Sequence, residues 1–383
     1  MLCLMSSAGH CFVLYSLHSL SSDANKPAED GEQIDFRLSL VDDNIDNGEL
    51  EAELKLFVTH RLAKGLAFDG SGIATVFDSK SSIMCYYCWL QLDEMTATTE
   101  SNQKTSVKDV KPNGFVVCFL SSLGLDLFCS ELNAYCGKLR HLLMNCRNVA
   151  ITEEVKDVLT NWYDRNVLYL CRCVQKLRAG LPSIIYAALM GIAVDINGGS
   201  RCDEDDITRF IDNCSVSALL QDKHQVDVAT VPSTSLLVDL TGGQEESDTC
   251  KSLTVTVLES AFKVSSKETN KFCKNWSIEM QGDEEENKPR YLRQVVESFK
   301  LKVIQDLNNL KRLIRQAEID HYALFRSFIF LRECGNASPL LRLCRQETQA
   351  PSAVDARNIL DILEEHMQRE GIVAQTTRRN DVA

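Results

Sequence analysis

The stretch that decides how this chain folds spans residues 290–334 and reads RYLRQVVESFKLKVIQDLNNLKRLIRQAEIDHYALFRSFIFLREC, without glycine or proline. Pro289 precedes it and Gly335 follows it, which is typical of the first turn and the end of a helix. Apolar residues recur in its first half at spacings of three and four, on one stripe of a helix. The stripe comprises Leu292, Val295, Val296, Phe299, Val303, Leu307, Leu310, Ile314 and Ala317. The pattern predicts a single helix over 290–334, roughly 60 Å long at 1.5 Å per residue.

From His321 onward the same stretch leaves almost no polar face, so we expect this half of the helix to be buried. Phe325, Phe328 and Ile329 are its predicted core residues. His321 and Cys334 could be posed as a base and a nucleophile, but the sequence supplies no third group to orient them. A packed helix histidine is the favoured interpretation.

Basic residues of the first half mostly lie away from the apolar stripe: Lys300, Lys302, Lys311, Arg312 and Arg315. A solvated helix face is the more frequent meaning of such a charge run. The alternative is a docking surface for an acidic partner or an anionic membrane. Two adjacent asparagines within a helix favour a contact site, because asparagine competes with the backbone for hydrogen bonds. The candidate partner-binding residues are therefore Asn308, Asn309, Lys311, Arg312 and Arg315.

Length and composition indicate a globular protein of two domains, since the 383 residues are 44% hydrophobic and 25% charged. The formal net charge of -13 argues against non-specific nucleic-acid binding, which needs concentrated lysine and arginine. The apolar run over 181–194 contains Pro182 and is shorter than the ~20 residues that span a bilayer. No basic segment precedes the apolar N-terminus, which argues against a signal peptide. We therefore expect membrane contact only through partners.

Sixteen cysteines lie mostly within apolar runs, which favours reduced, buried thiols in the cytosol over disulfides. Cys85 and Cys88 form a C-x-x-C, but a structural zinc site needs a second ligand pair, and no second C-x-x-C exists. If this segment is a strand, residues three apart point to opposite faces, so we interpret both as core residues. The sequence predicts no catalytic, cofactor-binding or metal-binding residue.

The N-terminal part reads as strands and helices in a definite order. Residues 34–40 alternate between apolar and polar, the period of a half-buried strand. Four further strands are predicted at 11–15, 73–77, 83–92 and 115–120, and two helices at 49–64 and 124–144. The order strand, strand, helix, three strands, helix resembles that of the longin fold, an antiparallel sheet flanked by helices. We therefore predict a longin-like α+β domain over 1–147.

The remaining residues, 151–383, are predicted to form a mainly helical domain. Thr152 can cap a helix that begins at Glu153. Two apolar runs, 236–240 and 253–258, flank a glycine pair and an acidic loop, so a small hairpin over about 236–258 is predicted. Helices are predicted over 262–280 and 353–368, on either side of the long helix 290–334.

Specific blocks of this sequence resemble the Njmu-R-one protein family. The blocks in the long helix are 299–302 (FKLK), 308–312 (NNLKR), 314–318 (IRQAE) and 321–325 (HYALF). Those in the N-terminal part are 36–40 (FRLSL), 85–88 (CYYC) and 116–120 (VVCFL). They occur in the family's order with similar spacing, whereas 181–260 matches poorly and the family's long acidic, serine-rich N-terminal arm is absent.

The resemblance implies a non-catalytic subunit of the WDR-eleven complex, which also contains a large WD-repeat protein and a FAM-ninety-one protein. That complex acts at the trans-Golgi network with a TBC-domain adaptor that binds golgins. It helps golgins capture endosome-derived vesicles formed with the AP-one clathrin adaptor. The implied location is therefore cytoplasmic and peripheral, at the trans-Golgi network and cytoplasmic vesicles. A link to sperm development is also attached to the family.

Two other classes of function stay open at this point. Longin-containing assemblies can regulate small GTPases, so an exchange-factor-like subunit is the main alternative. A metal-dependent enzyme with cysteine ligands is the weaker one, because its second ligand pair is missing.

Overall fold

The computed structural model describes residues 10–19, 36–63, 70–77, 82–92, 114–145, 151–221, 253–258, 261–282, 287–347 and 354–373. The chain divides into two compact units, Met1–Tyr169 and Leu170–Ala383. The fold is mixed α+β: a five-stranded antiparallel sheet with helices, then a mainly helical C-terminal region. This confirms the predicted fold class. The division falls after Tyr169, about twenty residues beyond the predicted boundary at 147–151.

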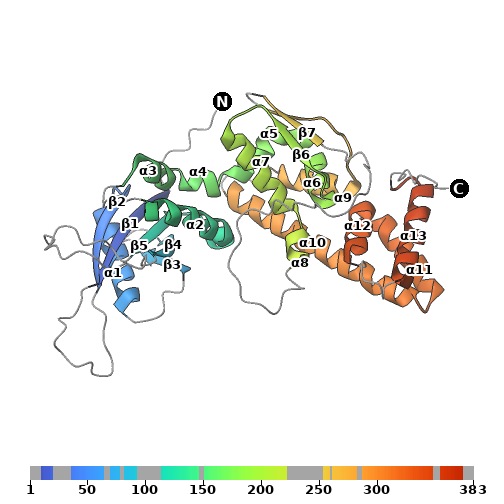
Figure 1. Cartoon of the computed structure of the whole chain (residues 1–383), viewed down its shortest axis with the longest axis horizontal. Helices are drawn as coiled ribbons and strands as arrows, with labels where there is room; N and C mark the ends of the chain where they lie inside the picture. The colour runs from blue at the N-terminus through green and yellow to red at the C-terminus, as the bar shows by residue number, and fades with distance from the viewer. Residues whose placement is uncertain are drawn as a thin grey trace, which may run out of the picture. The chain divides into compact units, whose positions relative to one another are not determined.

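The elements of the N-terminal unit follow the predicted order (Figure 1). They are β1 (His10–Ser19), β2 (Phe36–Asp43), α1 (Gly48–Ala63), β3 (Ser71–Phe77), β4 (Ser82–Gln91), β5 (Gly114–Ser121), the 3-10 turn η1 (Asp126–Phe128), α2 (Cys129–Asn145), α3 (Glu153–Thr160) and α4 (Trp162–Asn166). The strands lie in the order β2-β1-β5-β4-β3, and every neighbouring pair is antiparallel. The element order is the longin-type order that the sequence predicted.

Helices cover both faces of this sheet, which is why β5 at its centre is buried along its whole length. Leu50, Leu54 and Val58 of α1 pack on one face. Helices α2, α3 and α4 pack on the other. Cys85 belongs to the first core and Cys88 to the second, so the C-x-x-C points to opposite faces, as its spacing predicts.

The segment after α2 is part of this core. The hydroxyl of Tyr135 on α2 donates a 2.6 Å hydrogen bond to the carbonyl of Val158 on α3. The ring of Trp162 on α4 stacks on Phe119 of β5, with centroids 4.7 Å apart and planes 19° apart. Thr152 caps α3 through Val155, as predicted. These contacts bind α3 and α4 to the sheet, which places the unit boundary after them.

The C-terminal unit is built from helices and a small sheet. Its elements are α5 (Tyr169–Leu177, whose first residue closes the other unit), η2 (Arg178–Gly180), α6 (Leu181–Met190), β6 (Val194–Asn197), α7 (Arg201–Cys214), α8 (Ser217–Gln221), β7 (Leu253–Val257), β8 (Phe262–Val264), α9 (Lys271–Met280), α10 (Lys288–Ala317), α11 (His321–Cys334), α12 (Ala337–Glu347) and α13 (Val354–Arg369). The apolar run over 181–194 becomes α6, which Gly191 ends in a left-handed conformation at φ 54°, and then β6.

The three-stranded sheet differs from the predicted hairpin. Strand β7 pairs in parallel with β6 and antiparallel with β8, so both of its edges are occupied. The hairpin predicted over 236–258 is therefore wrong in its pairing, and residues 236–240 lie outside the described residues. The helix predicted over 262–280 begins only at Lys271, because its first residues form β8.

The predicted helix over 290–334 is two helices. Its ends are as expected, since Pro289 lies in the first turn of α10 and Gly335 ends α11 at φ 68°. Every residue of the predicted stripe on α10 is buried. The chain leaves the helix after Ala317, and the carboxylate of Asp320 caps α11 by accepting a 2.9 Å hydrogen bond from the Tyr322 amide. Helices α10 and α11 then pack against each other.

Replacing Trp162 with alanine in the full chain should lower the free energy of unfolding by about 3–5 kcal/mol, because its fully buried ring packs against the sheet. The matched control is Phe77→Ala, whose side chain is 70% exposed and whose loss should change stability little. Denaturant unfolding of both variants measures this. A Trp162 variant as stable as the wild type would show that α4 is not part of the N-terminal core.

Candidate partner-binding surface

The outer face of α10 carries the predicted partner-binding residues. Asn308, Asn309, Arg312 and Arg315 are exposed, as expected. None of the four has a hydrogen bond or ion pair with another described residue. Lys311 differs, because its side chain is only 23% exposed and forms an ion pair with Glu347 of α12. The predicted set therefore divides into four accessible side chains and one that is engaged within the fold.

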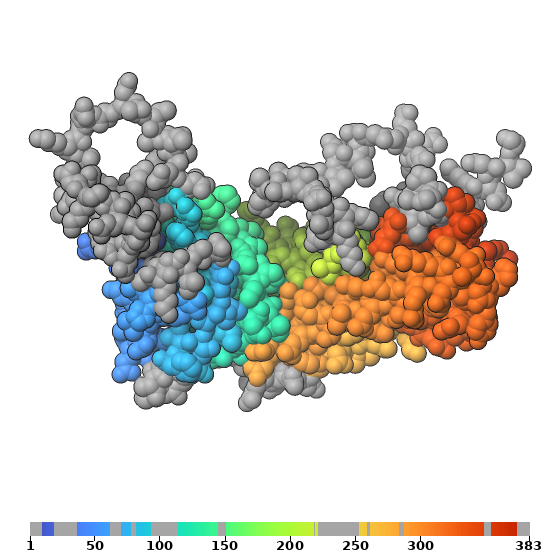
Figure 2. Space-filling model, turned by 90° about the horizontal axis from the view of Figure 1, so that it is seen from below, coloured from blue at the N-terminus to red at the C-terminus, as the bar shows by residue number. Residues whose placement is uncertain are grey.

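A shallow hollow of about 310 Å³ runs along this face and continues to the end of the helix. Its lining residues are Asn308, Lys311, Arg312, Arg315, Gln316 and Ile319. Each of them lies three or four residues from another of the set, which places them on one side of α10 and of the turn that follows it. The orange surface in Figure 2 includes atoms of α10, so part of this helix is exposed to solvent. The lining is cationic, with no acidic residue among the six.

The other predicted cations have partners within α10. Lys300 pairs with Glu297 at 2.9 Å, and Lys302 pairs with the buried Asp306 at 2.8 Å. Both are pairs one turn apart on the same helix. The sequence left a solvated face and a docking surface open for these five basic residues. Among the five, Arg312 and Arg315 are the two without an ion pair to another described residue.

Three large apolar residues of α11 that the sequence placed in the core are not buried. Phe325 is 56% exposed, so its predicted burial is wrong, and Phe328 and Ile329 are only half-buried. The turn at 318–320 changes the direction of the chain, and the buried side of α11 consists instead of Ala323, Ser327 and Leu331. Ala323 and Ser327 are small, which suits the close approach of two helices.

His321 and Cys334 lie at the first and last residues of α11, about 20 Å apart along a helix of this length. His321 is exposed rather than packed, which corrects the sequence interpretation. The two side chains are therefore too distant to act as a base and a nucleophile.

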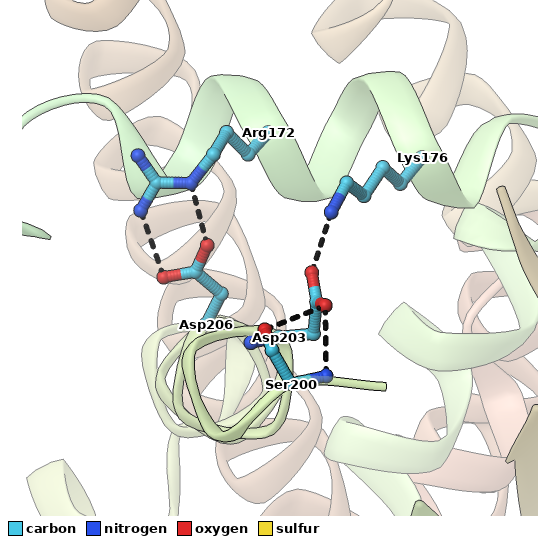
Figure 3. A network of polar contacts seen from close by, with 5 residues as sticks. All are labelled: Arg172, Lys176, Ser200, Asp203 and Asp206. Carbon is cyan, nitrogen blue, oxygen red and sulfur yellow. Dashed lines mark hydrogen bonds and ion pairs between the residues drawn. The ribbon is translucent and has the colours of Figure 1, made fainter. Parts of the chain in front are cut away.

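A second charged cluster joins α5 to α7 (Figure 3). The guanidinium of Arg172 donates two hydrogen bonds to the carboxylate of Asp206, at 2.7 and 3.0 Å. The ammonium of Lys176 donates one to Asp203 at 2.5 Å, and Asp203 also caps α7 through Ser200. Burial would raise the pKa of Asp203, but the hydrogen bonds from Lys176 and Ser200 outweigh it and lower that pKa. All four charged groups neutralise one another, so we interpret the cluster as structural.

The thirteen cysteines in the described part of the chain are free thiols. Burial raises the pKa of Cys11, Cys214 and Cys344 to about 12, so these thiols are protonated and poor nucleophiles at neutral pH. Cys88 differs, because a hydrogen bond with Cys136 lowers its pKa against the opposing effect of burial. Cys88 is only 7% exposed and packs within the sheet core, so an external substrate has little access to it.

Sequence comparisons show which family this chain belongs to. The model of the Njmu-R1-like protein family matches residues 17–369, which includes the middle region where the sequence blocks matched poorly. Protein Njmu-R1 of Mus musculus is 33% identical over 348 residues, covering 88% of this chain and 82% of the mouse protein. The chain therefore belongs to the Njmu-R1-like protein family.

Among the described helices, none combines the length and apolar character that crossing a bilayer requires.

Removing the carboxylate of Asp206 with Asp206→Ala should cost about 3 kcal/mol of unfolding free energy, because it leaves the mostly buried Arg172 without its bidentate partner. The matched control is Asp157→Ala, which breaks an Arg165–Asp157 pair whose side chains are 44% and 55% exposed. Such an exposed pair contributes roughly 0–1 kcal/mol. Denaturant unfolding compares the two variants, and equal losses would contradict the structural role of the Arg172–Asp206 pair.

Proposed function

We propose that this protein is a non-catalytic subunit of a vesicle-tethering complex at the trans-Golgi network. In this role it helps golgins capture endosome-derived vesicles formed with the AP-one clathrin adaptor. The observation that carries the proposal is membership of the Njmu-R1-like family along nearly the whole chain, since the sequence blocks resemble that family and imply this complex. Its partners are then the WD-repeat and FAM-ninety-one subunits of the WDR-eleven complex and the TBC-domain golgin adaptor.

Features of the C-terminal unit support a binding role. Two arginines and Asn308 of α10 line one hollow together with the exposed Ile319, which follows the helix. Arginine and exposed apolar residues together are typical of protein interfaces. The acidic and basic groups of the Arg172–Asp206 cluster form ion pairs with one another, so we interpret the cluster as stabilising the fold rather than as a catalytic site.

The proposal also sets a location. A subunit of this complex is cytoplasmic and peripheral, at the trans-Golgi network and cytoplasmic vesicles, and reaches membranes through its partners. The net charge of -13 supports partners other than nucleic acids.

Affinity purification of the tagged full chain from cells should recover the WD-repeat subunit and the FAM-ninety-one subunit, identified by mass spectrometry. The matched control is the Trp162→Ala variant, which should lower the amount of folded protein and the recovery together. Recovery of the intact wild-type chain without a WD-repeat subunit would contradict the proposed function.

A small-GTPase regulatory subunit, exchange-factor-like in action, is the second candidate. The longin-type element order of the N-terminal unit favours it, because longin-containing assemblies can have this activity. If the non-catalytic proposal holds, neither the purified chain nor its complex should accelerate release of fluorescent GDP from Golgi small GTPases. A rate that rises in proportion to added protein would favour the second candidate instead.

A further inference from the structure

The corner between α10 and α11 carries three large apolar side chains in solvent. Ile319 is 91% exposed, Tyr322 65% and Phe325 56%. The rings of Tyr322 and Phe325 lie 6.4 Å apart and form a common surface. Other large apolar residues that are exposed in the described part of the chain occur singly along the sequence, never three within seven residues. Exposed apolar residues grouped in this way mark an interaction site.

The same corner carries two cations that the fold leaves available. Arg312 and Arg315 line the 310 Å³ hollow together with Ile319. Neither forms an ion pair or hydrogen bond with another described residue, whereas the neighbouring Lys311 is neutralised by Glu347. A guanidinium presents a planar fork of donors that matches a carboxylate. On a chain of net charge -13, this local cationic lining is suited to acidic side chains.

We propose that this corner docks an acidic polypeptide segment of a partner subunit, with carboxylates on Arg312 and Arg315 and apolar side chains against Ile319, Tyr322 and Phe325. The inference deepens the proposed function and rests on it for the identity of the partner. Tyrosine, arginine and buried apolar anchors are the residues that contribute most energy at protein interfaces.

Charges at the turn favour a polypeptide over an anionic membrane. Glu318 and Asp320 are exposed at the same corner. A lipid surface of uniform negative charge is repelled by these carboxylates, whereas a folded segment can place each acidic group on an arginine. The hollow also suits an inserted side chain, which a flat bilayer surface does not supply.

The first test measures complex assembly with the full chain. The double reversal Arg312→Glu and Arg315→Glu, and separately Tyr322→Ala with Phe325→Ala, should each lower co-purification of the WD-repeat subunit about tenfold. There are two matched controls on α9, whose side chains are also exposed. The control for the charge reversal is the double variant Lys271→Glu, Lys274→Glu, and the control for the apolar truncation is Ile278→Ala. Thermal unfolding should be unchanged in all four variants.

The second test identifies what touches the corner. A photoreactive benzoylphenylalanine replaces Tyr322 in cells, with Ile278 as the matched control position. The crosslink at 322 should fall on a polypeptide segment rich in aspartate and glutamate, and reversing those acids to arginine should restore assembly of the Arg312→Glu, Arg315→Glu variant. A crosslink to lipid, a non-acidic segment, equal crosslinking at 278, or no rescue would overturn the docking surface.

The two proposals fail in distinguishable ways. If the wild-type chain recovers the WD-repeat subunit and the corner variants recover as much, the docking inference is wrong and the proposed function stands. If the wild type recovers no WD-repeat subunit, but the rescued acidic crosslink belongs to another protein, the surface stands and the proposed function is wrong. Flotation with phosphatidylcholine–phosphatidylserine vesicles tests the membrane alternative. If the wild-type chain binds these vesicles and the corner variants do not, the inference that the corner docks a polypeptide is wrong.

Discussion

The C-terminal unit depends on a turn at residues 318–320, where the carboxylate of Asp320 accepts a hydrogen bond from the Tyr322 amide. A cap of this kind contributes about 1 kcal/mol to stability. The remaining free energy that holds α11 in place therefore comes from its packing against α10 and α13. An uninterrupted helix would carry α11 about 20 Å further along its axis, beyond the reach of α10. The turn therefore both completes the core and exposes Ile319, Tyr322 and Phe325.

Charge pairing divides what the sequence presents as one basic face. Lys300 and Lys302 are engaged by acids one turn away on α10, and Lys311 by Glu347 from another helix. Arg312 and Arg315 point to the side of the helix where no described acid pairs with them. In the same unit, Arg172 forms an ion pair with Asp206, and Lys176 forms one with Asp203. Cations that lack an ion pair with a described residue, rather than a high density of cations, support the proposed acidic ligand.

Much of the N-terminal fold was predictable because its strands are short apolar or alternating runs bounded by turn residues. The sequence correctly predicted that Cys85 and Cys88 are core residues, because residues three apart on a strand point to opposite faces of the sheet. The unit boundary was not predictable, because α3 and α4 read as the start of a helical domain. The hydrogen bond from Tyr135 to Val158 and the stacking of Trp162 on Phe119 assign them to the sheet.

By itself, the sequence determined the order of elements in the N-terminal unit, the buried stripe of α10 and the family, because periodicity and residue blocks are local properties. Because the stretch contains no glycine or proline, the sequence predicted one helix, and the cap at Asp320 is seen only in the structure. The tertiary structure decided that Phe325 is exposed, that β7 pairs with β6 and β8, and that Lys311 is engaged. These outcomes depend on which distant segment covers a given face, and Lys311 and Glu347 meet only because the chain folds back between them.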